Sequence, residues 1–200
     1  YGDHRDLPSF PTLRSSDLYF TKSINSGSSF VTPDVRVNSV TTNDQLYPKI
    51  SANSDGIHVV WQDYATSVTS PTIEYTKSTN SGVSFITPSK RVSSVMASVN
   101  TAPTIALAPS GRIFVAWQNN SNAYLSWSVN KGNTFLRERL FSRETQNRQN
   151  PVIAVDASGR LFGSWHITTF EVFCLEYTGA YLTIQTGINE IGRASCRERV

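Results

Sequence analysis

Two pairs of adjacent side chains have types that could act on a bound ligand. Asp63 and Tyr64 open the longest loop of their kind, and Arg143 and Glu144 present a cation and a carboxylate together. Carboxyl groups can pass protons to and from a reacting group when they are positioned against it. We therefore take Asp63, Tyr64, Arg143 and Glu144 as the catalytic candidates. The simpler interpretation, a polar rim with no chemical duty, is the one that the sequence favours.

Other reactive residue types receive a structural interpretation. Arg36, Arg91 and Arg139 could suggest a carboxylate-binding triad, but they recur at equivalent positions of an internal repeat. Equivalent positions lie around a ring and do not converge on one ligand. His58 and His166 have no partner ligands at metal-site spacing. The sequence therefore predicts no metal and no cofactor.

The elements that must position these residues are set by a repeated octet, Ser-x-Asn-x-Gly-x-Ser/Thr-Phe. Copies begin at Ser23, Ser78 and Ser128, so the spacings are 78 − 23 = 55 and 128 − 78 = 50 residues. The shared members are Ser23, Asn25, Gly27 and Phe30, then Ser78, Asn80, Gly82 and Phe85, then Ser128, Asn130, Gly132 and Phe135. Glycine permits positive φ, and asparagine accepts hydrogen bonds from turn amides. We expect the three Phe rings to be buried between neighbouring repeats.

A second motif lies between the octets and predicts two strands around a tight glycine turn. Its copies start at a proline and end at Trp61, Trp117 and Trp165. A Trp at a repeated inward strand position is expected to be core. One unit is then four short strands in about 50 residues, the pattern of a propeller blade.

The predicted strands fall into sets that follow the repeat, with no helix of ten or more residues. The ranges are 18–23 and 29–38; 47–53, 57–62, 72–78 and 84–94; 102–108, 112–118, 123–128 and 134–141; and 150–156 and 160–166. The pattern thus predicts that residues 19–166 form one partial blade, two complete blades and the beginning of another blade. Residues 167–189 lose the pattern and are interpreted as a divergent or frameshifted blade remainder.

The octets resemble the Asp-box, or bacterial neuraminidase repeat, with the pattern Ser-x-Asp-x-Gly-x-Ser/Thr-Trp/Phe. All three copies here carry Asn in place of Asp, which keeps the acceptor oxygen and loses the charge. The resemblance covers Tyr19 to about Trp165 and implies an all-β fold, a partial sialidase-like β-propeller with four-stranded antiparallel blades and Asp-box turns. In that family the Asp-box is a folding element. The Arg-Ile-Pro marker of sialidases is absent, so no catalytic residue carries over.

Both ends of the chain resemble translated sequencing adapter. Residues 1–18 differ from one adapter frame only at Pro8 and Leu13, and residues 190–200 resemble the reverse complement in another frame. The alternative is two natural charged tails. On the adapter interpretation these ends have no native role, and residues 1–17 and 191–200 should pack poorly or be irregular.

The resemblance implies a segment of a secreted sialidase-like protein, extracellular or at the cell surface. If its parent is an enzyme, we expect a glycoside hydrolase of the exo-α-sialidase type, with the segment itself inactive. The alternatives are a non-catalytic propeller module that binds glycan or protein at the cell surface, and a stretch of a repeat array with no site. The expected partners are a glycan such as a sialoside, or a cell-surface protein.

Composition excludes several other classes. The net charge of +3 is too mild to predict nucleic-acid binding, and basic residues are scattered. No apolar run approaches the roughly 18 residues of a membrane span. Two cysteines, Cys174 and Cys196, define neither a disulfide framework nor a zinc site.

Overall fold

The computed structural model describes residues 16–93, 99–120, 122–141, 148–167, 172–177 and 182–185, with the backbone alone for 148, 167, 172–177 and 182–185. These residues form one two-stranded and three four-stranded antiparallel sheets. They contain no helix, and hence none that could span a membrane. The prediction of an all-β fold with four-stranded antiparallel blades is confirmed.

Each sheet follows chain order and is called a blade here. Blade 1 pairs β1 (Tyr19–Phe20) with β2 (Val35–Arg36). Blade 2 holds β3 (Gln45–Asn53), β4 (Gly56–Asp63), β5 (Thr72–Ser78) and β6 (Lys90–Arg91). Blade 3 holds β7 (Asn100–Leu107), β8 (Ile113–Asn119), β9 (Asn122–Ser128) and β10 (Arg139–Leu140). Blade 4 holds β11 (Arg148–Val155), β12 (Leu161–Ile167), β13 (Val172–Tyr177) and β14 (Leu182–Gln185).

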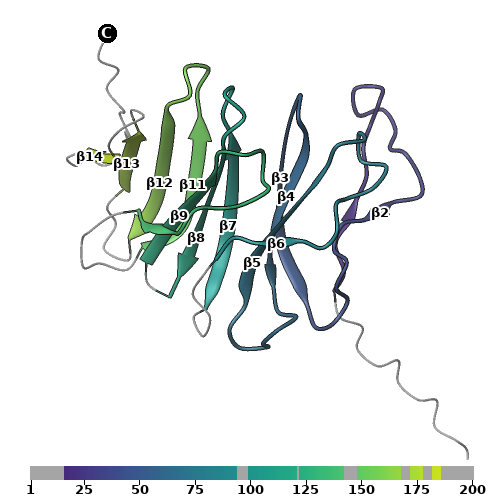
Figure 1. Cartoon of the computed structure of the whole chain (residues 1–200), viewed down its shortest axis with the longest axis horizontal. Helices are drawn as coiled ribbons and strands as arrows, with labels where there is room; N and C mark the ends of the chain where they lie inside the picture. The colour runs from purple at the N-terminus through teal and green to yellow at the C-terminus, as the bar shows by residue number, and fades with distance from the viewer. Residues whose placement is uncertain are drawn as a thin grey trace, which may run out of the picture.

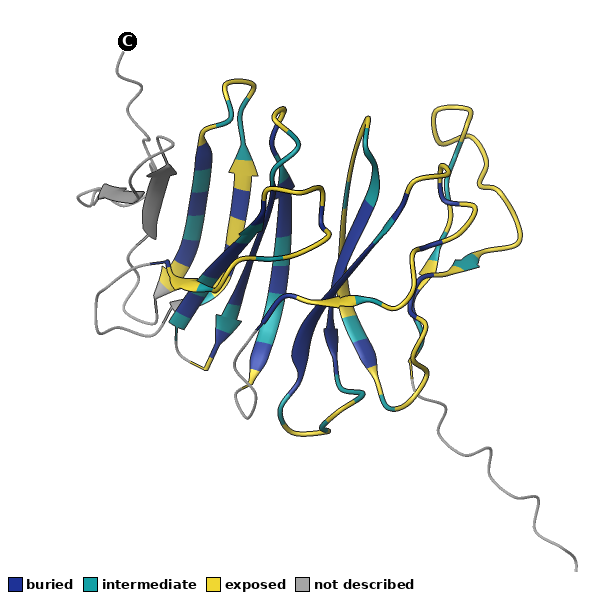
Figure 2. Cartoon of the chain, in the orientation of Figure 1, coloured by how far each residue is buried: buried dark blue, intermediate teal, exposed yellow. Residues whose placement is uncertain are grey.

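The blades follow one another along the long axis of the molecule (Figure 1). Three apolar clusters fill the three spaces between neighbouring blades. Trp61, Trp117 and Trp165 each belong to the cluster shared with the preceding blade and are almost fully buried, as the repeat predicts. The middle strands β4, β5, β8 and β9 are therefore mostly buried. Exposure concentrates in the connecting loops, along β3 and on the short outer strands β6 and β10 (Figure 2).

The predicted outer strands at 29–38, 84–94 and 134–141 are wrong in length. Only two residues pair in each case, in β2, β6 and β10. Before them the chain makes one backbone bond to the neighbouring strand, such as Ile86 N to Lys77 O at 2.9 Å, then leaves the ladder. The Thr76 hydroxyl bonds the Ile86 carbonyl at 2.6 Å, so a side chain replaces part of the ladder at this edge.

The first strand of each four-stranded blade carries a bulge. The ladder register shifts at Tyr47, Ala102 and Asn150, whose φ values are 54°, 50° and 49°. A proline follows each of them and cannot donate a ladder hydrogen bond. Bulges of this kind bend a strand and re-aim its side chains near a rim.

At the amino-terminal end, Ser16 and Asp17 lie outside the strands, which agrees with the expectation that residues 1–17 are irregular, but both make hydrogen bonds. The Ser16 carbonyl accepts from the Gln45 amide at 2.9 Å, and Asp17 Oδ1 accepts from Asn38 Nδ2 at 2.8 Å. Leu18 is buried against blade 2. Residues 1–15 and 186–200 lie outside the described residues, so the adapter origin of the ends stays a prediction. So does the interpretation of residues 167–189, whose strands β13 and β14 complete the sheet of blade 4.

Candidate functional site

The loop that enters blade 2 and the loop that leaves its second strand are joined at one end of the blade. Asn43 Nδ2 donates to the Tyr64 carbonyl at 3.1 Å, and the Tyr64 amide donates to the Asp44 carbonyl at 2.9 Å. The Asp44 carboxylate accepts from the Ser16 amide at 2.9 Å. Hydrogen bonds among the loop residues thus fix the polar groups of this rim.

Asp63, the first catalytic candidate, is buried and engaged at both carboxylate oxygens. Oδ2 accepts from Trp61 Nε1 at 3.0 Å, and Oδ1 accepts from the Ala65 amide at 2.7 Å. Only 5% of the residue is exposed. The carboxylate fixes the Trp61 ring and closes the turn that follows β4, which is a structural role.

Tyr64, the second candidate, is half-buried in the same loop. Its hydroxyl accepts from Gln62 Nε2 at 2.6 Å. Asp63 and Tyr64 therefore lie together at the rim, as adjacent residues must, but they bond different partners. Arg143 and Glu144 lie outside the described residues, so their placement stays a prediction.

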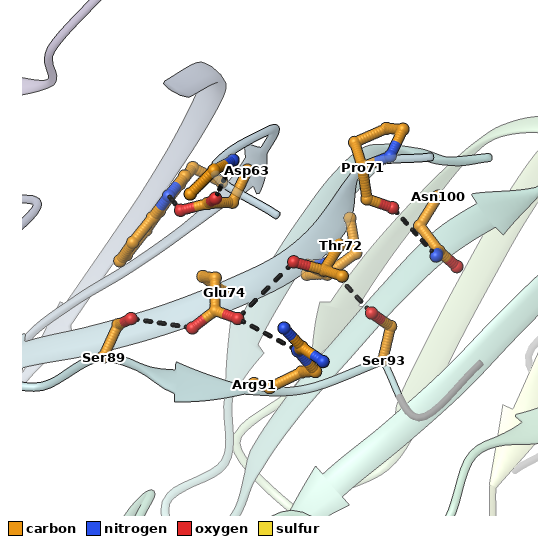
Figure 3. A network of polar contacts seen from close by, with 11 residues as sticks. Asp63, Pro71, Thr72, Glu74, Ser89, Arg91, Ser93 and Asn100 are labelled. Carbon is orange, nitrogen blue, oxygen red and sulfur yellow. Dashed lines mark hydrogen bonds and ion pairs between the residues drawn. The ribbon is translucent and has the colours of Figure 1, made fainter. Parts of the chain in front are cut away.

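A buried acidic residue that the sequence analysis did not single out lies beside Asp63. Glu74 on β5 pairs in register with Trp61 and Arg91, so these side chains share the face turned toward blade 1. Its carboxylate accepts from Ser89 Oγ at 2.7 Å and from Arg91 Nε at 3.4 Å (Figure 3). Burial raises the pKa of Glu74, and the Asp63 charge adds to that increase against the opposing bond from Ser89.

The repeat itself held the signal for Glu74. Four residues before the serine of each octet stand Tyr19, Glu74 and Tyr124. Tyr124 stacks on Trp117 at 6.1 Å between ring centroids, whereas Glu74 places a carboxyl opposite Trp61. The other two copies carry tyrosine at this position, and a buried charged residue in its place needs a partner, which Arg91 supplies.

The three octets adopt the same closed hydrogen-bond pattern. In the second copy, Ser78 Oγ donates to Asn80 Oδ1 at 2.8 Å and accepts from the Gly82 amide at 2.8 Å. Asn80 Oδ1 also accepts from the Ser84 amide at 3.0 Å, while Asn80 Nδ2 donates to Ser84 Oγ at 2.9 Å. The first and third copies repeat these four bonds. The octets are built as turns, and their repeated Ser and Asn side chains are engaged within the turn itself.

Within the described residues, no group of three or more His, Cys, Asp or Glu side chains could hold a metal ion. His58 bonds Tyr75 and Asn53 inside the blades, and His166 bonds Gln149 on β11.

The expectation that three arginines occupy equivalent positions is wrong for Arg139. Arg36 and Arg91 pair with Tyr19 and Glu74, whereas Arg139 pairs with Leu125, one place further along its strand, and Leu140 takes the equivalent position. Arg91 pairs with Glu74, Arg36 lies 3.9 Å from Asp17, and Arg139 lies over the Trp127 ring.

No protein-family model matches this chain, and no curated protein matches it. Solved structures do match. The NanB sialidase from Streptococcus pneumoniae is 12% identical over 86% of this chain and 28% of its own, with a TM-score of 0.60. An α-L-arabinanase from Penicillium chrysogenum is 16% identical over 86% of this chain and 55% of its own, with a TM-score of 0.61. An α-L-arabinofuranosidase from Fusarium graminearum is 12% identical with the same two coverages and a TM-score of 0.63.

These likenesses show the fold, which is that of β-propeller glycosidases. This chain spans between 28% and 55% of the length of the three proteins. Their activities belong to the complete proteins, and a shared fold does not transfer a reaction.

Proposed function

We propose that this chain is a segment of a secreted sialidase-like Asp-box protein of the exo-α-sialidase class, and that the segment alone is inactive. The fold and the geometry of the three octets support the family. One observation supports the inactivity: both oxygens of Asp63 are bound by the protein's own donors. Hydrolysis of a glycosidic bond by carboxyl groups requires that they reach the sugar.

Glu74 does not supply the missing acid. Its raised pKa would suit proton donation, but its carboxyl is buried against blade 1 and paired with Arg91. A carboxyl held inside a junction between blades cannot contact a glycosidic oxygen at the rim. The remaining candidates, Arg143 and Glu144, would then act only with residues from further blades.

The alternative, a non-catalytic module that binds glycan or protein at the cell surface, is favoured by one feature. Tyr47 is 63% exposed on the bulge of the first strand of blade 2. Exposed tyrosine rings offer an apolar face and a polar tip, a combination suited to sugar rings. A sialoside is the ligand that the proposed family indicates.

The test is an assay of the purified 200-residue chain with fluorogenic sialoside and arabinofuranoside substrates. We expect no turnover above a heat-treated sample, with an intact sialidase as positive control. Turnover that is lost in Asp63→Asn would refute the proposed inactivity and place a catalytic carboxylate at this rim.

Binding distinguishes the alternative. Calorimetric titration with sialyllactose should show weak binding that Tyr47→Ala removes. The matched control is Tyr19→Ala, because Tyr19 is 62% exposed but lies on blade 1. Equal binding by the two variants would exclude Tyr47 as the contact.

A further inference from the structure

At the junction between blades 1 and 2, two residues of blade 1 make three contacts with the octet of blade 2. The Phe20 ring lies edge-on to Phe85, with 5.5 Å between centroids. The same ring covers Gly82, where an added Cβ would lie 2.2 Å from Phe20 Cε1. Two residues beyond Phe20, Lys22 Nζ donates to the Ser81 carbonyl at 2.6 Å. One blade thus contacts the octet of the next blade through an aromatic ring and a lysine ammonium group.

The junction between blades 2 and 3 repeats these contacts with different residues. The Tyr75 ring lies edge-on to Phe135 at 5.0 Å and covers Gly132. Lys77 Nζ donates to the Lys131 carbonyl at 2.6 Å. The pattern aromatic-x-Lys on the third strand of a blade is therefore matched to an octet on the following blade.

The junction between blades 3 and 4 has neither partner. The positions equivalent to Phe20 and Lys22 are Leu125 and Trp127, and no octet occurs in residues 167–189. Leu125 packs instead in an apolar cluster with Phe141 and Trp165. The aromatic-x-Lys pair and the octet are present together at two junctions and absent together at the third. An octet therefore predicts an aromatic-x-Lys pair on the preceding blade.

Blade 1 carries an octet whose corresponding contact surface is exposed. Ser26 has a φ of 56°, matching 57° at Ser81 and 59° at Lys131, so the turn has the same backbone. No atom lies within 4 Å of a Cβ built on Gly27, and Phe30 is 61% exposed whereas Phe85 is 8% exposed. The prediction that the Phe30 ring is buried is wrong, because no described residue occupies the position that Phe20 and Tyr75 fill at the other octets.

We propose that Ser26, Gly27 and Phe30 form a docking socket for the third strand of a further blade that carries an aromatic-x-Lys sequence. Its ring covers Gly27 and lies edge-on to Phe30, and its ammonium group binds the Ser26 carbonyl. Burial of the two rings supplies the apolar contribution, and the lysine selects the register. This inference rests on the proposed function only in treating the chain as a segment of a larger propeller.

The experiment supplies such a strand in the correct register. Asp17 lies six residues before Ser23, as Asn122 lies six residues before Ser128, so the two positions are equivalent in the repeat. A second copy of residues 42–121, which covers β3 to β8, is therefore joined directly to Asp17. The added blade then presents a second Tyr-Thr-Lys sequence to the socket. The matched control carries Tyr75→Ala and Lys77→Ala in the added copy alone. Hydrogen exchange of the amides at 27–31 is compared among the tandem protein, the control and the original chain.

We expect exchange at 27–31 to be slower by about tenfold or more in the tandem protein, and close to the original rate in the control. Equal rates in tandem and control overturn the proposal. An added blade that gains no protection also overturns it, because a matching strand would fold against the socket.

A second copy of the chain is the competing occupant. Sedimentation velocity of the original chain should show a monomer. A dimer that Phe30→Asp dissociates would overturn the proposed occupant. Exchange and sedimentation are independent of sialoside turnover, so this inference and the proposed function can fail separately.

Discussion

Nδ1 of His58 lies 2.8 Å from the hydroxyl of Tyr75, and both side chains are buried between blades 2 and 3. Nε2 of His58 lies 3.3 Å from Asn53 Oδ1, which also accepts from the Asp55 amide at 2.9 Å. Because Asn53 Oδ1 can only accept, the proton of a neutral His58 belongs on Nε2, and Tyr75 donates to Nδ1. Burial lowers the pKa of His58 to about 4, with a smaller contribution from the Lys77 charge.

The chain should lose stability on acidification through His58. The folded pKa of about 4 lies below the ordinary 6.5, so the folded state favours the neutral ring. The contribution is complete above pH 6.5 and is lost as the pH falls toward 4, amounting to at most about 3 kcal/mol. We expect His58→Gln to flatten the melting temperature against pH in this window. The control His166→Gln, at an exposed position, should leave the curve unchanged.

Arg91→Ala should destabilise the fold because it leaves the buried Glu74 carboxylate without its cation. Loss of a partner of a buried charged group costs roughly 1–3 kcal/mol. Arg36→Ala is the matched control, since Arg36 occupies the equivalent position in blade 1 but is half exposed and 3.9 Å from Asp17. That change should stay within about 0.5 kcal/mol. Urea denaturation at pH 7 measures both, and equal effects would contradict the role given to Arg91.

Gly82→Ala should cost more than Gly27→Ala. The φ values are +82° and +87°, so both variants carry a similar backbone strain of about 1–2 kcal/mol. The added methyl at residue 82 also meets the Phe20 ring, while the one at residue 27 meets nothing within 4 Å. Overpacking of this kind adds about 1–3 kcal/mol. Thermal unfolding of the two variants side by side gives the difference, and no difference would mean that Phe20 moves freely.

Asn80→Asp should be tolerated where Asn80→Ala is not. Asp keeps the acceptor for Ser78 Oγ and the Ser84 amide, and the Ser84 hydroxyl can rotate to donate to the second oxygen. We expect a change within about 0.5 kcal/mol for Asp and a loss of about 1–2 kcal/mol for Ala. Chemical denaturation separates the two outcomes. A large loss for Asp would show that the octet depends on the Nδ2 donor.

The sequence by itself determined the features whose contacts are local. The octet turn closes through hydrogen bonds within seven residues, from Ser78 to Ser84, so its residue types predict its geometry. The inner strands are also predicted from local sequence, because the alternating apolar pattern and the glycine turn lie within one hairpin. The predicted range 72–78 is the observed β5, and 57–62 falls within β4.

Only the tertiary structure decided what each repeated residue does. Phe30 and Phe85 stand in octets of one pattern, yet one is exposed and the other is buried, since burial depends on a ring from the neighbouring blade. Asp63 is a candidate catalyst by residue type and a structural acceptor by position, because Trp61 and the Ala65 amide fold onto it. Glu74 acquires its partner from β6, seventeen residues further along the chain. Contacts between strands and between blades are absent from a local pattern, and they decide which polar groups remain free to meet a ligand.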